Sequence, residues 1–309
     1  EWRDLRALGV ESLLLKPFDG DQLTTTIQAC INVASAGDRV MIPAGNYTES
    51  LLLNKAVSLT GVNSATTIIH APTDQRVLLV TGASINSTVV ISGLMLTGAK
   101  YISDPLCPSN ESCGGGILLQ DSASPTLQNL TIAENEVSNG AGLYVGGNSR
   151  PNLIGIHLRN NLAYNNGGGL YTLTTLKITN SRFTNNNAYY GDGLYAMAAL
   201  EIHDTQFVSN GLAAGQGNGG GIYIIGNLSL NGGYFFNNGG NEGNGLYAIG
   251  TVELQNTQFL SHTLSRGSGA YIEGNLTMTE GIFADNRGDA LWTTGTLNLS
   301  HVQFLRNKG

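Results

Sequence analysis

The chain has 309 residues, of which only 12% are charged and 42 are glycine. This composition argues against a helical protein and against a charged disordered segment, and an apolar content of 41% suffices for a sizeable core. The formal net charge of −7 disfavours nucleic acid and anionic membranes as partners. No run of apolar residues is long enough to predict a membrane span.

The N-terminal part predicts a linker followed by one helix. Residues 1–20 are too few to form a domain, and we expect a linker or a fusion remnant there. Residues 21–38 include LTTTIQACINVASAGD, an amphipathic pattern that predicts a helix ending at Ala-Gly-Asp. Cys30 falls inside this pattern and is expected to be buried as a small apolar side chain. Such a helix would cover the open end of the strands that follow.

From residue 114 onward the chain repeats a glycine-flanked apolar–aromatic motif, such as GGGLY. Its copies begin at residues 114, 140, 167, 191, 219, 243, 267 and 288. A second marker, a Phe followed three residues later by Asn, keeps the same spacing from Phe183 to Phe304, with His262 as the exception. The spacing between successive copies changes by the same amount for both markers. Insertions must therefore fall outside the marked segments.

Each repeat predicts three short strands and no helix. A short run such as LKI at residue 176 lies between the two markers, and apolar and polar residues alternate in it. This alternation predicts a half-buried strand. A repeat of this kind can bury its apolar face only by stacking on its copies. We therefore predict an all-β fold, a single-stranded right-handed parallel β-helix of roughly eleven coils over residues 39–309, with an N-terminal capping helix. Stacking would place Leu170 and Phe183 in two inward columns, and the Asn series in a ladder at left-handed turns.

Two resemblances agree with this prediction. Residues 23–62, which contain GDRVMIPAGNYTE and SLTG, resemble the start of the pectate-lyase-like β-helix superfamily. The glycine motifs, together with FTNN, FVSN, FFNN, FADN and FLRN, resemble the repeats of the polymorphic outer membrane protein family, although the third motif position is usually Gly here instead of Ala. The resemblance implies a right-handed β-helix. This fold hosts lyases, hydrolases, adhesins and inert stalks, so it does not select a function.

One position of the motif predicts a column of aromatic side chains on the outside of the first strand, because neighbours in a strand point to opposite faces. The column consists of Tyr144, Tyr171, Tyr195, Tyr223, Tyr247, Tyr271 and Trp292. It could be a platform on which sugar rings stack, which would make a polysaccharide or another surface ligand the partner. The alternative is a self-stacked aromatic ladder that stiffens an exposed sheet.

Two glutamates are the candidates for catalysis. Glu201 and Glu253 share an outward column and would lie two coils apart, about 10 Å. This separation is marginal for the carboxyl pair of an inverting glycosidase. Lys177 would neighbour Glu201, and the simpler interpretation is a surface ion pair.

The longest insertion, residues 100–113, predicts either a ligand site or a solvated loop. Asp104, Glu111 and Asp121 lie in or near this insertion and could bind a calcium ion. Cys107 and Cys113 bracket PSNES in the same loop and could close a small disulfide. No motif in the sequence calls for a cofactor.

These patterns together favour a non-catalytic β-helix module, extracellular or on the cell surface, that acts in adhesion or as a structural unit and has the tyrosine column as its carbohydrate-binding candidate. The alternative is a carbohydrate-active enzyme, either a polysaccharide lyase or a glycoside hydrolase. The segment FLRNKG stops where the next glycine motif should begin. We therefore expect the coils to continue or to pack on another unit, and head-to-tail self-association is a further hypothesis.

Overall fold

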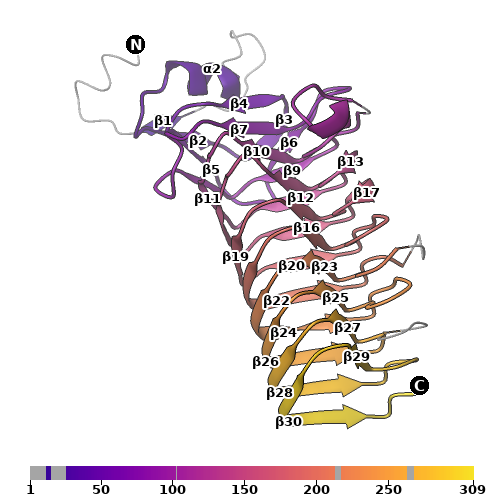
Figure 1. Cartoon of the computed structure of the whole chain (residues 1–309). Helices are drawn as coiled ribbons and strands as arrows, with labels where there is room; N and C mark the ends of the chain where they lie inside the picture. The colour runs from indigo at the N-terminus through magenta and orange to yellow at the C-terminus, as the bar shows by residue number, and fades with distance from the viewer. Residues whose placement is uncertain (1–11, 15–25, 102, 213–216, 263–267) are drawn as a thin grey trace.

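The computed structural model describes residues 12–14, 26–101, 103–212, 217–262 and 268–309, which form a parallel β-helix (Figure 1). The predicted all-β solenoid is confirmed. One of its sheets has ten strands, which mark ten turns where roughly eleven coils were expected. In the described residues, no helix has the length and apolar content that a bilayer crossing requires.

The ten-stranded sheet takes one strand from each coil. Its strands, in chain order, are β4 (Leu51–Leu53), β7 (Leu78–Thr81), β10 (Ile117–Gln120), β14 (Leu143–Val145), β18 (Leu170–Thr172), β21 (Leu194–Ala196), β23 (Ile222–Ile225), β25 (Leu246–Ile249), β27 (Ala270–Glu273) and β29 (Leu291–Thr293). Neighbours pair in parallel and in register, so that Leu170 lies beside Leu194 and Tyr171 beside Tyr195.

The other two faces of the coil belong to one sheet of 18 strands. Its strands are β1 (Ser12–Leu14), β2 (Arg39–Ile42), β3 (Gly45–Thr48), β5 (Ser58–Gly61), β6 (Thr67–His70), β8 (Val90–Ser92), β9 (Met95–Thr97), β11 (Thr126–Gln128), β12 (Thr131–Ala133), β15 (Asn152–Ile154), β16 (His157–Arg159), β19 (Leu176–Thr179), β20 (Arg182–Thr184), β22 (Leu200–Val208), β24 (Leu228–Phe236), β26 (Val252–Leu260), β28 (Leu276–Ala284) and β30 (Leu297–Leu305). A third, small sheet pairs β13 (Glu136–Asn139) with β17 (Leu162–Asn166).

One helix, α2 (Ile27–Val33), covers the N-terminal end of the stack (Figure 1). It is shorter than the predicted segment 21–38, because Thr26 caps its first turn and Gly37 adopts a left-handed conformation in the turn after it. Cys30 is a buried free thiol, as expected. Most of the predicted linker at residues 1–20 lies outside the described residues, but β1 pairs with β2 and adds a strand there.

Two inward columns form the core and confirm the stacking predicted from the repeat. Leu170, its counterparts in the neighbouring coils and the phenylalanine series from Phe183 to Phe283 are fully buried. The phenylalanine rings stack nearly parallel, with centroids 4.7–5.0 Å apart. This spacing is that of adjacent strands, so each ring contacts the next without distorting the sheet.

A ladder of buried amides runs beside the phenylalanine column. The Nδ2 of Asn186 donates to Oδ1 of Asn210 at 3.0 Å and to the carbonyl of Leu158 at 2.9 Å. The ladder consists of Asn135, Asn161, Asn186, Asn210, Asn238, His262, Asn286 and Asn307. The hydrogen bonding was predicted correctly, but the left-handed residue is the preceding one, Asn185 or Ser209, and not the ladder Asn.

The glycine motif has two separate steric causes. Its first glycine is left-handed, with φ of 61° at Gly191 and 71° at Gly219, and turns the chain into the first strand. Its third glycine faces the next coil, where a Cβ on Gly193 would stand 2.5 Å from the carbonyl oxygen of Gly221. The Ala found at this position in the repeats that the sequence resembles therefore has no room in this stack, except at Ala290, which directly precedes β29, the last strand of the sheet.

We expect Gly193→Ala to lower the free energy of unfolding by about 1–3 kcal/mol, the usual range for overpacking, because the carbonyl of Gly221 cannot move without shifting a coil. Denaturant titration measures the loss. The reverse change at the same motif position, Ala290→Gly, is the control and should cost less than about 1 kcal/mol. Equal unfolding midpoints for Gly193→Ala and the wild type would contradict this account.

His262 makes the ladder sensitive to acid. Burial lowers its pKa to about 4, and the neutral ring donates from Nδ1 to Asn286 while Nε2 accepts from Asn238. Between pH 6.5 and 4 the unfolded chain binds the proton and the folded chain does not, so stability is present above pH 6.5 and is lost as the pH falls.

His262→Asn should remove this loss, because an amide continues the ladder without titrating. The free energy of unfolding of the variant, relative to the wild type, should rise by about 3 kcal/mol between pH 7 and pH 4. His157, whose pKa burial also lowers to about 4, stays in both proteins and cancels from the difference. A difference that does not change with pH would refute the assignment.

Candidate functional site

The outer face of the ten-stranded sheet carries a straight column of apolar and aromatic side chains, one from each coil. We call this set the outer column: Leu52, Leu79, Leu118, Tyr144, Tyr171, Tyr195, Tyr223, Tyr247, Tyr271 and Trp292. The predicted aromatic column is therefore present and in register. Three leucines extend it toward the N-terminus; Leu118, in GGGIL, was recognisable as a motif copy with Leu at the Tyr position.

The rings of the outer column stack on one another. Successive centroids from Tyr144 to Trp292 lie 4.1–5.1 Å apart with interplanar angles of 3–13°. Each ring therefore covers the faces of its neighbours, which is the arrangement of the self-stacked ladder. A ligand can therefore contact ring edges and hydroxyl groups of the column, but not ring faces.

Not all members of the column are accessible, contrary to the expectation that all seven aromatic residues face solvent. Tyr144, Tyr247 and Tyr271 are buried; each stacks on a neighbouring ring, and the two cysteines of the disulfide also pack against Tyr144. The rings of Tyr171, Tyr195 and Tyr223 in the middle of the sheet are half-buried, and so is Trp292 at its end. Burial raises the pKa of Tyr171 to about 12, so its hydroxyl keeps its proton and can donate a hydrogen bond at neutral pH.

A second line of apolar side chains lies beside the middle of the outer column. Leu173, Met197 and Ile225 each follow a column tyrosine by two residues and are 37–48% exposed. The hydroxyl of Tyr171 lies 3.6 Å from Sδ of Met197, which ties the two lines together. Strand alternation could have revealed these residues, because positions two apart share a face.

Two further tyrosines extend this surface from the loop before β21. The Tyr190 ring lies 5.3 Å from that of Tyr223, and Tyr189, 45% exposed, packs edge-on against Tyr190. We call the whole exposed area the middle patch: Tyr171, Leu173, Tyr189, Tyr190, Tyr195, Met197, Tyr223 and Ile225. It contains no charged side chain.

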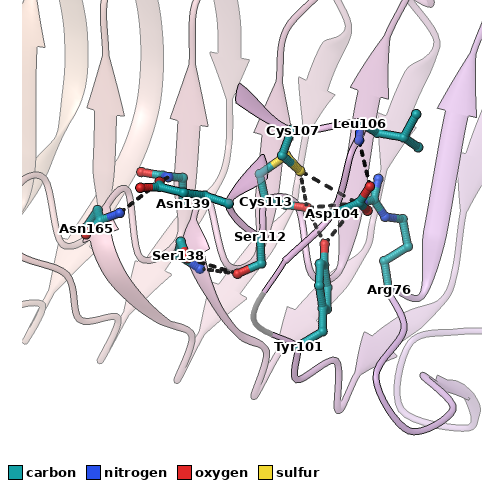
Figure 2. Close-up of a disulfide and its surroundings, with 11 residues drawn as sticks. Arg76, Tyr101, Asp104, Leu106, Cys107, Ser112, Cys113, Ser138, Asn139 and Asn165 are labelled. Atoms are coloured by element: carbon teal, nitrogen blue, oxygen red, sulfur yellow. Dashed lines mark hydrogen bonds and ion pairs between the residues drawn. A yellow bond between two sulfur atoms is a disulfide. The ribbon is translucent and has the colours of Figure 1, made fainter. Parts of the chain in front are cut away.

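The predicted disulfide between Cys107 and Cys113 is present within the loop of residues 103–113, which we call the disulfide loop (Figure 2). The two cysteines pack against Leu118 and Tyr144 and so cover the N-terminal end of the aromatic ladder. Beneath the loop, Arg76 is only 6% exposed and forms an ion pair with Asp104.

The three acidic residues proposed as a calcium site do not come together. Asp104 pairs with Arg76; Oε2 of Glu111 accepts from Nδ2 of Asn139 at 2.8 Å; and Oδ2 of Asp121 accepts from the hydroxyl of Thr81 at 2.6 Å. Across the described ranges, no three His, Cys, Asp or Glu side chains gather where they could hold a metal ion. Each carboxylate is instead used to fix a loop to its neighbouring strands.

The two candidate catalytic glutamates lie on a different face from the outer column. Glu201 and Glu253 are two coils apart with Ser229 between them in register. The ion pair of Glu201 with Lys177, 2.5 Å, is as predicted, and the hydrogen bond from Lys177 lowers the pKa of this exposed carboxyl. A general acid needs a raised pKa, so this environment suits surface pairing better than proton donation.

One carboxyl with a raised pKa was missed by sequence reasoning. Burial raises the pKa of Asp192, the second residue of its glycine motif, to about 8, and its Oδ1 accepts from the backbone N–H of Ala188 at 2.6 Å. The side chain is almost completely enclosed, so it holds a corner of the coil and does not face a substrate.

Comparisons with known proteins agree with this architecture. Residues 92–259, more than half of the chain, match the family model described as the right handed beta helix region. A search of curated proteins returned no match.

Solved structures are similar at low identity. The catalytic domain of a GH87 alpha-1,3-glucanase in complex with nigerose is 12% identical with a TM-score of 0.46, and the match covers 91% of this chain and 63% of that one. The Dettilon tailspike protein is 11% identical with a TM-score of 0.44, over 94% and 68% of the two chains. A pectin methylesterase in complex with a hexasaccharide is 10% identical with a TM-score of 0.39, over 94% and 80%.

The chain thus spans less than two thirds of the glucanase domain, and the likeness to these structures concerns the fold alone. The match to the family model, together with the in-register stacking of the coils, assigns the family. The chain belongs to the right-handed β-helix family.

Proposed function

We propose that this β-helix is a non-catalytic module, extracellular or on the cell surface, that acts in adhesion and binds carbohydrate along the outer column. The observation that carries the proposal is the middle patch, a partly exposed area of apolar and tyrosine side chains, none of them charged, on and beside the ten-stranded parallel sheet. Contiguous patches of this kind mark interaction sites in soluble proteins. The disulfide supports an oxidising environment, in which such bonds persist.

The geometry of the middle patch suits a neutral glycan that runs along the rod. The ring centroids of Tyr171, Tyr195 and Tyr223 are 5.0–5.1 Å apart, close to the length of one sugar residue, and each ring carries a hydroxyl group at its edge. Leu173 and Met197 lie alongside and offer apolar contact to the C–H groups of a sugar ring. Tyrosine is well suited to this task because it combines apolar area with a polar tip.

The environments of Glu201 and Asp192 favour binding over hydrolysis. Glu201 is exposed, paired with Lys177 and of lowered pKa, and Asp192 is enclosed in the coil. The alternative of a lyase or a glycoside hydrolase therefore has weaker support than binding along the outer column.

Tyr195→Ala and Tyr223→Ala should each weaken the binding of neutral oligosaccharides by roughly tenfold, because each change removes one hydroxyl edge and part of the apolar surface. Isothermal titration calorimetry with soluble glucan and xylan fragments measures the change. The control is Tyr234→Ala, which removes a half-buried tyrosine from β24 on another face. Thermal unfolding of each variant separates lost contacts from lost folding.

Equal losses in the control and in the column variants, or no binding at millimolar sugar, would contradict the proposal. New reducing ends, or ultraviolet absorbance from unsaturated sugar ends, would reveal an enzyme. If Glu201→Gln abolished that activity, the non-catalytic assignment would be wrong.

Head-to-tail self-association remains a prediction within this proposal. Leu297, Leu299 and Phe304 on β30 are 38–47% exposed, whereas the equivalent side chains one coil earlier are fully buried. A second copy that covered this edge would bury them. Sedimentation at micromolar protein should then show assemblies that Leu299→Lys weakens, and a strict monomer at all concentrations would exclude the association.

A further inference from the structure

A pocket of about 280 Å³ lies at the N-terminal end of the outer column. Leu52 and Leu79, the first two members of that column, form part of its wall, and the turn that holds Asp74 and Arg76 forms another part. Tyr101 and residues of the disulfide loop complete the lining. Its volume lies just below the ~300 Å³ at which small-molecule sites begin. The pocket therefore has room for a ligand of about one ring.

Arg76 has hydrogen-bonding capacity that the protein does not use. Its Nη2 donates to the hydroxyl of Tyr101 at 3.0 Å and to the carbonyl of Cys113 at 3.3 Å, and it pairs with Asp104 (Figure 2). Its Nη1 is buried and finds no hydrogen-bond partner among the residues that the structure describes. A buried donor without a partner is rare and unfavourable, and an oxygen acceptor of a bound ligand would satisfy it.

The charges around the pocket favour a neutral acceptor over an anion. Asp104 already compensates the single arginine, and Asp74 adds a second carboxylate to the lining. A carboxylate or phosphate ligand would meet a site with one positive and two negative groups. A hydroxyl or ether oxygen can accept from Arg76 without this repulsion.

The remaining lining combines apolar and hydroxyl-binding groups. Leu52, Leu79 and Leu106 give apolar contact, and Ser50, Gln75 and Ser103 can exchange hydrogen bonds with hydroxyl groups. A sugar ring needs both, because its C–H faces are apolar and its rim is covered with hydroxyls. We propose that this pocket binds one neutral sugar residue, and so is a second contact, separated from the middle patch by the disulfide loop, for the class of glycan on which the proposed function rests.

The disulfide contributes to this site by holding the loop over Arg76. Sγ of Cys107 and the carbonyl of Cys113 both lie against Nη2 of Arg76, at 3.8 and 3.3 Å. The guanidinium is therefore positioned before a ligand arrives, which lowers the entropy lost on binding.

Two variants test the pocket without removing Arg76 or the disulfide. Ser50→Tyr fills the pocket, and Ser87→Tyr, on an exposed turn away from it, is the matched control. Asp74→Asn changes only the charge; Asp74 has φ of 57°, which Asn tolerates well. Calorimetry with a neutral trisaccharide and with a trisaccharide of uronic acids gives the readout, and thermal unfolding confirms that each variant folds.

We expect Ser50→Tyr to weaken binding of the neutral trisaccharide by roughly tenfold or more and Ser87→Tyr to leave it unchanged. Asp74→Asn should strengthen binding of the acidic trisaccharide several-fold, because one repulsive charge is lost, and so narrow the preference for the neutral one. Wild-type affinity in Ser50→Tyr, or a wild-type preference for the acidic ligand, overturns the inference.

The inference rests on the proposed function, but the two fail in different ways. If Tyr195→Ala weakens binding and Ser50→Tyr does not, the outer column binds glycan and the pocket does not. If Ser50→Tyr weakens binding and Tyr195→Ala has no effect on long or short glycans, the pocket binds sugar and the column role is wrong. If no neutral sugar binds the wild type at millimolar concentration, both are wrong.

Discussion

In-register stacking of one coil on the next is the constraint on which the rest of this structure depends. Parallel strands lie at a fixed separation, so residues one repeat apart become vertical neighbours with little freedom to shift. The phenylalanine rings, the amide ladder and the outer column all repeat at this distance. The third glycine of the motif shows how tight the constraint is, because a Cβ on Gly193 would reach the carbonyl of the coil beside it.

The same spacing determines what the outside of the molecule can do. Tyrosine rings that repeat at the strand separation stack on each other, so each ring face is covered by the next ring. Only the ring edges can then contact a ligand. Regular columns provide a long and uniform surface. Distinct chemistry arises where the repeat is interrupted, and the disulfide loop is such a place, because it encloses an arginine that the repeats themselves would not contain.

The disulfide loop also explains why the prediction of a disulfide was correct and the prediction of a calcium site was not. Cys107 and Cys113 are close along the chain, so their pairing needed little from the rest of the fold. Asp104, Glu111 and Asp121 lie in or near the same loop, yet Arg76, Asn139 and Thr81 from other coils each satisfy one of them. Each of these donors is 28–40 residues from its carboxylate along the chain. Local sequence patterns therefore could not predict these pairs.

Repetition within the amino-acid sequence was enough to predict the solenoid, its inward columns and the position of the outer aromatic column. It also predicted the ion pair of Lys177 with Glu201. Each of these features follows from which residues recur at the repeat length. Only the folded coil decided that Asn185 and not Asn186 is left-handed, and that the tyrosine faces are covered. It also decided that Tyr247 is buried while Tyr195 is half-buried, and that Arg76 lies under a loop at the wall of a pocket. These features depend on how insertions from different coils pack against one another, and insertions do not repeat.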